Sequence, residues 1–233
     1  MENIGSEIMR VRSAIIGSST GIGRALVKLH REQGIECVAF SRKPEQMEGV
    51  VGIQLDLTNG GQAGEILRDT FREYPEIETV YLVSGTGDVE ATLDYELAQS
   101  TMALNCNGFT LAAYCAAEYF EERGFGGLVA VTSVAAIRGG GKSLSYNASK
   151  AYQSSLLEGL RCRFTGLKKA IAVTEVRAGF VDTAMMKADK PFWVATARQA
   201  AEAMMTAGRS GKNLVYVLGR WRIVGWLLTV MPV

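Results

Sequence analysis

The chain has 233 residues, of which 48% are hydrophobic and 21% charged, and its formal net charge is +1. This length suits one domain, and the near-neutral charge gives no sign of a nucleic-acid partner. One histidine and four cysteines without C-x-x-C spacing argue against a metal site and against a histidine-based catalytic triad.

The N-terminal residues 1–9 are expected to be a disordered lead-in. They lack the basic segment and long apolar run of a signal peptide. The cysteines are scattered, as in proteins of a reducing compartment. We therefore expect a cytoplasmic protein. His30, in "ALVKLHREQG", is expected on the surface of a helix or half buried there.

Apolar runs and segments of helical periodicity alternate along the rest of the chain. The runs expected to be strands are 13–17, 35–40, 50–55, 77–83, 127–133, 170–176 and 213–218. The segments expected to be helices are 23–33, 63–74, 95–123, 145–164 and 191–207. Gly34 suits the C-terminal cap of the first helix, and Pro191 suits the first turn of the last. The alternation predicts one α/β domain, a doubly wound parallel seven-stranded sheet with helices on both faces.

A glycine cluster follows the first expected strand, in "IIGSSTGIGRAL". Gly17, Gly21 and Gly23 lie at the turn into the first helix, where glycine permits a tight turn and exposed N–H groups favour a pyrophosphate. The alternative is a glycine-rich turn that binds nothing. No Lys-Ser/Thr follows, so the segment is not a Walker A loop.

The stretch "SYNASKAY" places Tyr146 four residues before Lys150, on one face of a helix. Tyrosine titrates near pH ~10, and a neighbouring cation lowers its pKa. The two residues are therefore either a tuned acid–base pair or unrelated neighbours on a helix surface.

Taken together, "GSSTGIG" and "SYNASK" resemble the short-chain dehydrogenase/reductase family in its compact single-domain form. The resemblance spans roughly residues 12–218 and implies a Rossmann fold. In "AVTSVAAI" it assigns the family's serine to Ser133, and in "ALNCNG" it assigns the family's asparagine to Asn105.

This resemblance implies four catalytic residues. Tyr146 would be the general acid, and Lys150 would lower its pKa and hold the nicotinamide ribose. Ser133 would donate to the carbonyl oxygen, where negative charge develops. Asn105 would position a water that links Lys150 to solvent. In isolation, Ser133 would be read as a strand-end serine that satisfies the backbone, and Asn105 as a residue at a helix kink or cap.

The cofactor is expected to be NADP(H) rather than NAD(H). An NAD enzyme commonly has Asp or Glu after the second strand, whereas this chain has Ser41, Arg42 and Lys43. A guanidinium can pair with the 2′-phosphate of NADP, although a solvated basic loop is the alternative. By resemblance, Asp56 meets the adenine and Thr183 the nicotinamide amide. The expected cofactor-binding residues are Gly17, Ser19, Gly21, Ile22, Gly23, Ser41, Arg42, Asp56, Leu57, Gly87, Tyr146, Lys150 and Thr183.

Two segments depart from the family's pattern. After the fourth strand the family often has N-N-A-G, whereas this chain has "SGTG", Ser84–Gly87. Hydrogen bonds that support the central strands must therefore come from elsewhere. Ala178 replaces the usual proline before Gly179, which is expected to loosen that turn.

The substrate is less defined by the sequence. Residues 184–194 are expected to form a lid, and Met185, Met186, Phe192 and Trp193 either line an apolar pocket or belong to the core. An aliphatic or aromatic ketone, a sugar-derived carbonyl and a carrier-bound 3-oxoacyl group all stay open.

The C-terminal tail, residues 219–233, is apolar but too short to span a bilayer. It is expected to be a helix packed on the fold or a subunit contact. A membrane-surface anchor, with Arg220 and Arg222 at its edge, is the least favoured reading.

We expect a homodimer or homotetramer. In the resembling family, the helices around 95–123 and 145–164 form a four-helix subunit contact. The apolar residues of these helices that exceed the needs of one sheet face include Leu111, Tyr114, Tyr119, Phe120, Tyr152, Leu156 and Leu160.

The sequence as a whole predicts an NADP(H)-dependent oxidoreductase that interconverts a carbonyl and a secondary alcohol, with small-molecule substrates and no bound metal. The alternative is a catalytically idle dinucleotide-binding sensor or scaffold of the same fold.

Overall fold

The computed structural model describes residues 10–44, 46–90, 92–188 and 190–231, so the expected lead-in and the last two residues of the tail lie outside it. Seven parallel strands form one sheet in the order β3-β2-β1-β4-β5-β6-β9. Their bounds are β1 Ser13–Ile16, β2 Cys37–Ser41, β3 Val50–Gln54, β4 Thr79–Leu82, β5 Phe125–Ser133, β6 Ala170–Ala178 and β9 Leu214–Tyr216. The predicted doubly wound Rossmann fold is confirmed.

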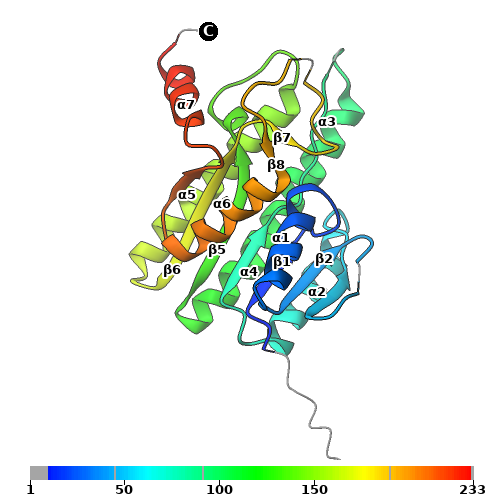
Figure 1. Ribbon diagram of the computed structural model, residues 1–233, viewed down its shortest axis with the longest axis vertical. Helices are drawn as coiled ribbons and strands as arrows, with labels where there is room; N and C mark the ends of the chain where they lie inside the picture. Colours follow the sequence, from blue (N-terminus) through cyan, green and yellow to red (C-terminus); the bar gives the residue numbers. More distant parts are fainter. Residues whose placement is uncertain (1–9, 45, 91, 189, 232–233) are drawn as a thin grey trace, which may run out of the picture.

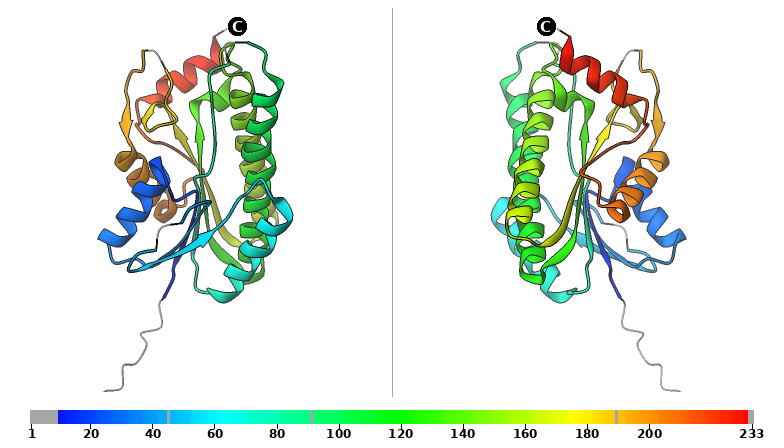
Figure 2. Two further views of the ribbon diagram at one scale, coloured as in Figure 1. Left: turned by 90° about the vertical axis from the view of Figure 1, so that its right-hand side faces the viewer. Right: turned by 90° about the vertical axis from the view of Figure 1, so that its left-hand side faces the viewer.

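Helices cover both faces of this sheet (Figures 1 and 2). One apolar cluster lies between the sheet and α1 and α6, and a second lies between the sheet and α2, α4 and α5. Both faces of the central strands are therefore buried, and β1 has no exposed residue. The helix bounds are α1 Gly21–Glu32, α2 Gly60–Glu73, α3 Tyr95–Met102, α4 Phe109–Arg123, α5 Leu144–Gly166, α6 Ala197–Ser210 and α7 Trp221–Val230.

The helix ends follow capping chemistry. Gly34 has a φ of +65° just after α1, and its N–H donates to the carbonyl of Arg31, so the predicted glycine cap is confirmed. The prediction that the last long helix begins at Pro191 is wrong. α6 begins after Thr196, which forms a capping box with Gln199.

The expected helix over 95–123 is interrupted. Between α3 and α4 the chain forms a π-helical segment, Ala103–Gly108, that contains Asn105. Gly108 fits there because a Cβ would lie 2.8 Å from the Cβ of Leu57. Such a local change of winding leaves the spacing of apolar residues almost intact, so periodicity does not reveal it.

His30 is buried, contrary to the expected surface or half-buried position. Its Nδ1 lies 2.9 Å from the carbonyl oxygen of Leu26, and its ring meets Tyr81 edge-on. This burial lowers the pKa of His30, because the interior disfavours the charged imidazolium.

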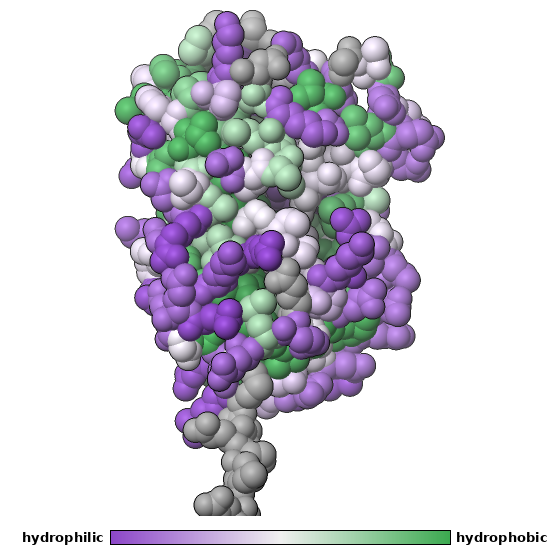
Figure 3. Space-filling view, turned by 45° about the vertical axis from the view of Figure 1, so that its right-hand side comes forward, coloured by the Kyte–Doolittle hydropathy of each residue, from purple (hydrophilic) through white to green (hydrophobic). Residues whose placement is uncertain are grey.

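The described part of the tail forms α7, which lies at the end of the molecule where the strands finish (Figure 1). Trp221 and Gly225 are buried against the fold, as expected for a packed helix. Ile223 and Trp226 face outward and are 60% and 64% exposed, so the subunit and membrane-surface readings stay predictions. Apolar side chains gather at this end in the space-filling view (Figure 3). Among the described helices, none is long and apolar enough to cross a membrane.

The expected subunit contact remains a prediction, and it involves fewer residues than the sequence indicated. Phe120 and Leu160 are buried in the core of the chain and are not available to a partner. Tyr114 and Tyr152 are exposed on α4 and α5. Of the residues expected in the subunit contact, these two tyrosines are therefore large side chains that a partner could reach.

Candidate active site

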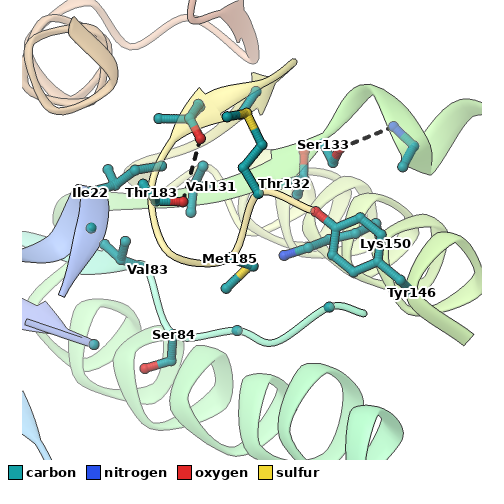
Figure 4. A pocket seen from close by; sticks show the side chains of 18 of the residues that line it. Ile22, Val83, Ser84, Val131, Thr132, Ser133, Tyr146, Lys150, Thr183 and Met185 are labelled. Atoms are coloured by element: carbon teal, nitrogen blue, oxygen red, sulfur yellow. Dashed lines mark hydrogen bonds between the residues drawn. The ribbon is translucent and has the colours of Figure 1, made fainter. Parts of the chain in front are cut away.

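A pocket of about 710 Å³ lies at the carboxyl ends of the strands (Figure 4). This is where ligands bind in open α/β sheets. The pocket brings together most of the residues predicted from sequence, namely Gly17, Ser19, Gly21, Ile22, Ser41, Arg42, Asp56, Leu57, Gly87, Ser133, Tyr146, Lys150 and Thr183. Two predicted residues, Gly23 and Asn105, do not line it and lie behind its wall.

The glycine turn forms one wall of this pocket. Gly17 has a φ of +100°, and a Cβ there would lie 2.5 Å from the backbone nitrogen of Ser84. A Cβ at Gly23 would lie 1.9 Å from the carbonyl oxygen of Gly17, so Gly23 allows the turn to close on α1. Thr20 precedes α1, but its side chain accepts no hydrogen bond from the helix. The first N–H groups of α1 are therefore not capped by this side chain. This cradle fits the pyrophosphate of a dinucleotide.

One end of the pocket lies at the ends of β2 and β3. Ser41 has a buried hydroxyl that lacks a hydrogen-bond partner in the described structure, and Arg42 beside it is exposed. Asp56 accepts hydrogen bonds from the side chain and backbone of Thr58, which lower the pKa of its carboxyl group, and Arg42 contributes to this shift. An unpaired buried hydroxyl next to a guanidinium fits the ribose of a dinucleotide.

The reactive groups lie on β5 and α5. Ser133 ends β5, and its Oγ accepts from the backbone N–H of Ala135 at 3.1 Å. Tyr146 and Lys150 project from α5 into the pocket, which Ser133 also lines (Figure 4). Gly87 lets the tyrosine ring fit, because a Cβ there would lie 2.5 Å from a ring carbon. The constellation can present an O–H group to a bound oxygen.

The role predicted for Lys150, to lower the pKa of Tyr146, stays a prediction, and burial of the two groups acts against it. Burial raises the pKa of Tyr146 above its usual value, and the polar side chain of Ser133 only partly opposes this effect. The Lys150 Nζ lies 5.7 Å from the centre of the tyrosine ring. Burial also lowers the pKa of Lys150 from 10.5 to about 8. Desolvation therefore dominates at both groups.

Asn105 supports the site from behind. Its Nδ2 donates to the carbonyl of Thr86 at 2.7 Å, and its Oδ1 accepts from the N–H of Thr86 at 2.8 Å. These bonds hold the "SGTG" segment, and the N–H groups of Val83 and Ser84 donate to Ile16. They supply the support that the altered segment was expected to need.

A buried glutamine was not anticipated. Gln153 follows Lys150 on α5, accepts from its Nζ at 2.9 Å, and donates from Nε2 to the backbone carbonyl of Asn105 at 2.8 Å. Its position three residues after Lys150 places it on the same helix face, which is the sequence signal that could have identified it.

The outer pocket, which is the part lined by residues of the expected lid (184–194) and of α7, lies beyond the reactive groups. Met185, Met186 and Phe192 line it, as one of the two readings expected, whereas Trp193 does not line it and packs edge-on against Trp221. The sequence did not indicate that Trp221, Val224 and Leu228 of α7 would also line the pocket. The lid is framed by two short paired strands, β7 Val181–Asp182 and β8 Ala195–Thr196.

Within the described ranges, no group of three or more His, Cys, Asp or Glu side chains is arranged to hold a metal ion. The polar groups that line the pocket include hydroxyls, two ammonium and two guanidinium groups, two carboxylates and an amide, and the cationic groups suit an organic ligand that carries phosphates.

Curated proteins similar to this chain are oxidoreductases. An uncharacterized oxidoreductase of Myxococcus xanthus is 28% identical over 224 residues, covering 89% of this chain and 85% of that protein. Another from Staphylococcus aureus is 24% identical over 190 residues, covering 77% of this chain and 81% of its own.

Solved structures share the fold. A short-chain dehydrogenase from Burkholderia cenocepacia in complex with NADP has a TM-score of 0.81 at 23% identity, covering 95% of this chain and 94% of its own. A short-chain dehydrogenase from Sphingobium yanoikuyae in complex with NADPH has a TM-score of 0.79 at 19% identity, covering 95% and 96%. The family described as short chain dehydrogenase matches residues 13–192. The chain belongs to this family of oxidoreductases.

Proposed function

We propose that the protein is an NADP(H)-dependent carbonyl reductase in which Tyr146 is the general acid. The observation that carries this proposal is that Tyr146, Ser133 and Lys150 line one pocket together with the glycine turn. A bound nicotinamide supplies hydride to the carbonyl carbon. Tyr146 gives a proton to the carbonyl oxygen, and Ser133 donates a hydrogen bond to that oxygen as its negative charge grows.

Lys150 has two roles in this proposal. Its Nζ lies beneath the Tyr146 ring and lines the pocket, where it can donate to the hydroxyls of the nicotinamide ribose. Its positive charge favours the phenolate that remains after proton transfer. Because burial raises the pKa of Tyr146, the residue is protonated at neutral pH and is suited to the reductive direction.

The preference for NADP(H) rests on Arg42. It lines the pocket beside Ser41, where a 2′-phosphate would lie, and Lys43 follows in the same loop. The two solved relatives described above hold NADP and NADPH, which supports the same preference here.

A neutral apolar ketone is the substrate that the outer pocket fits best. Lys187 is paired with Asp88 at 2.6 Å, Arg138 donates to the carbonyl of Met231 at 3.0 Å, and Asn147 donates to two backbone carbonyls. These polar groups are engaged within the protein, and Met185, Phe192 and Leu228 provide apolar contacts. This favours a ketone over a carrier-bound 3-oxoacyl group, whose phosphates require free cations.

The test follows NADPH consumption with matched carbonyl compounds. Alkyl and aryl ketones are compared with ketones of the same length that end in a carboxylate. We expect turnover with the neutral compounds and much less with the charged ones. Binding of NADPH without turnover of any carbonyl would instead indicate the catalytically idle sensor or scaffold.

A further inference from the structure

Gln153 connects two residues of the candidate site through its side-chain amide. It lies on α5 with no exposed surface. Its Oε1 accepts from Lys150 Nζ at 2.9 Å, and its Nε2 donates to the Asn105 carbonyl at 2.8 Å. A buried amide costs stability unless it is hydrogen-bonded, and here each end has a partner.

The hydrogen bonds of Asn105 determine which of its groups is available to the Gln153 amide. The side chain of Asn105 is occupied by Thr86 and by Ser149, to which its Nδ2 donates at 3.0 Å. Gln153 instead donates to the backbone carbonyl of Asn105, which lies within the π-helical segment. The amide therefore spans the space between this carbonyl and the Lys150 ammonium.

We propose that Gln153 is a positioning residue that holds Lys150 for catalysis and replaces a water-mediated link between Lys150 and Asn105. The proposal rests on the proposed function of Tyr146 and Lys150. The proposal also determines how Tyr146 regains the proton that it gives to the substrate. A carboxamide keeps both hydrogens on its nitrogen at neutral pH, so it does not pass a proton along as water does. The proton that Tyr146 gives to the substrate oxygen is regained from water that enters the open pocket after the alcohol leaves.

Three substitutions separate hydrogen bonding from packing. Gln153→Met fills nearly the same volume but neither donates nor accepts a normal hydrogen bond. Gln153→Ala opens a cavity lined by the Lys150 ammonium and the Asn105 carbonyl, which is polar enough for water to enter. Gln153→Glu keeps an acceptor for Lys150 and adds a charge. Thr70→Val is the control, because it removes another buried hydrogen bond, to Ile66 on α2, far from the pocket.

We expect Gln153→Met to lower kcat at least tenfold and Gln153→Ala to retain more activity than the methionine variant, since water restores the bridge. Thermal stability should follow the opposite order, because alanine loses more packing. A residue that only fills space would instead give the same order, Met above Ala, in both measurements. NADPH affinity, measured by fluorescence, should fall in Gln153→Met, because Lys150 also holds the ribose.

The pH profile gives an independent readout. Two titratable groups face Lys150, Tyr146 on α5 and Cys106 in the π-helical segment. Gln153→Met should move the alkaline limb of kcat/KM to lower pH, because the ammonium loses an acceptor. Gln153→Glu should move that limb to higher pH, because a carboxylate stabilises the ammonium.

Wild-type kcat and an unchanged pH profile in Gln153→Met would overturn the inference, as would an alanine variant less active than the methionine variant. A Tyr146→Phe variant that keeps full turnover would overturn the proposed function itself. The two failures are thus distinguishable.

Discussion

The indole of Trp221 lies so close to Gly179 that a Cβ at this glycine would come within 2.0 Å of the ring. The indole also stacks on Phe192 at 5.0 Å between ring centres, and its Nε1 donates to the carbonyl of Trp193 at 3.3 Å. Gly179 follows β6, whereas Phe192 and Trp193 belong to the lid. The Trp221 side chain of α7 therefore contacts both the lid and the end of β6.

Gly179→Ala should displace Trp221 and loosen α7 from the pocket. Overpacking of this kind costs about 1–3 kcal/mol. We expect a lower melting temperature and a raised KM for the ketone, with a smaller effect on NADPH binding. Gly219→Ala is the matched control, since a Cβ there meets nothing within 4 Å. Equal behaviour of the two variants would contradict the proposed anchoring.

Tyr146→Phe should reduce turnover at least ~10²-fold, the scale on which general acid catalysis contributes, and leave NADPH affinity almost unchanged. Tyr152→Phe is the control on the same helix, because its hydroxyl meets Thr110 Oγ1 at 2.7 Å, away from the pocket. Steady-state kinetics together with a fluorescence titration decide the matter. Near-normal turnover in Tyr146→Phe would remove the assignment.

Arg42→Ala should weaken NADPH binding and leave NADH binding nearly unchanged. A charge-assisted hydrogen bond contributes ~1.5–3 kcal/mol, which corresponds to roughly a ten- to hundredfold change in affinity. Arg72→Ala, which removes an exposed guanidinium paired with Asp69 on α2, controls for the loss of charge. If Arg42→Ala weakens both cofactors equally, Arg42 does not bind the 2′-phosphate.

Lys150→Met should change the pH dependence of stability in the protein without cofactor. Burial lowers the pKa of Lys150 from 10.5 to about 8, so the folded state holds this charge less favourably than the unfolded chain. The resulting cost is fully present below pH 8 and disappears as the pH rises toward 10.5. It amounts to about 3 kcal/mol by linkage.

We therefore expect the unfolding free energy of wild type, relative to Lys150→Met, to rise across this pH range. Chemical denaturation at several pH values measures it. Lys28→Met on the exposed side of α1 should show no such trend. A pH-independent difference for Lys150→Met would mean that the ammonium is better solvated than its position indicates.

Much of the fold was predictable because it depends on local patterns. Buried parallel strands need continuous apolar runs, so segments such as 127–133 stood out, and the alternation with helices fixed the architecture. Some pocket residues were predictable for a similar reason, since the glycines and the Tyr146–Lys150 pair occur at spacings set by the turn and the helix. Ser133, Asp56 and Thr183 were expected only because the chain resembles a known family.

Other features depend on what surrounds a residue in three dimensions. The raised pKa of Tyr146 follows from burial, which no spacing in "SYNASK" shows. Trp221 looks like any residue of an apolar tail until its position against Gly179 is known. The start of α6 was misplaced because Pro191 is a good first-turn residue, but the Thr196 capping box prevails.

The position of α7 over the pocket also determines what the intrinsic fluorescence of the protein reports. The chain has three tryptophans, and all lie in the lid or α7: Trp193, Trp221 and Trp226. The emission spectrum therefore observes this one end of the molecule, whereas far-ultraviolet circular dichroism observes the sheet and all helices. Denaturation followed by both signals would show whether α7 detaches before the domain unfolds, because two transitions that do not coincide reveal a separate local unit.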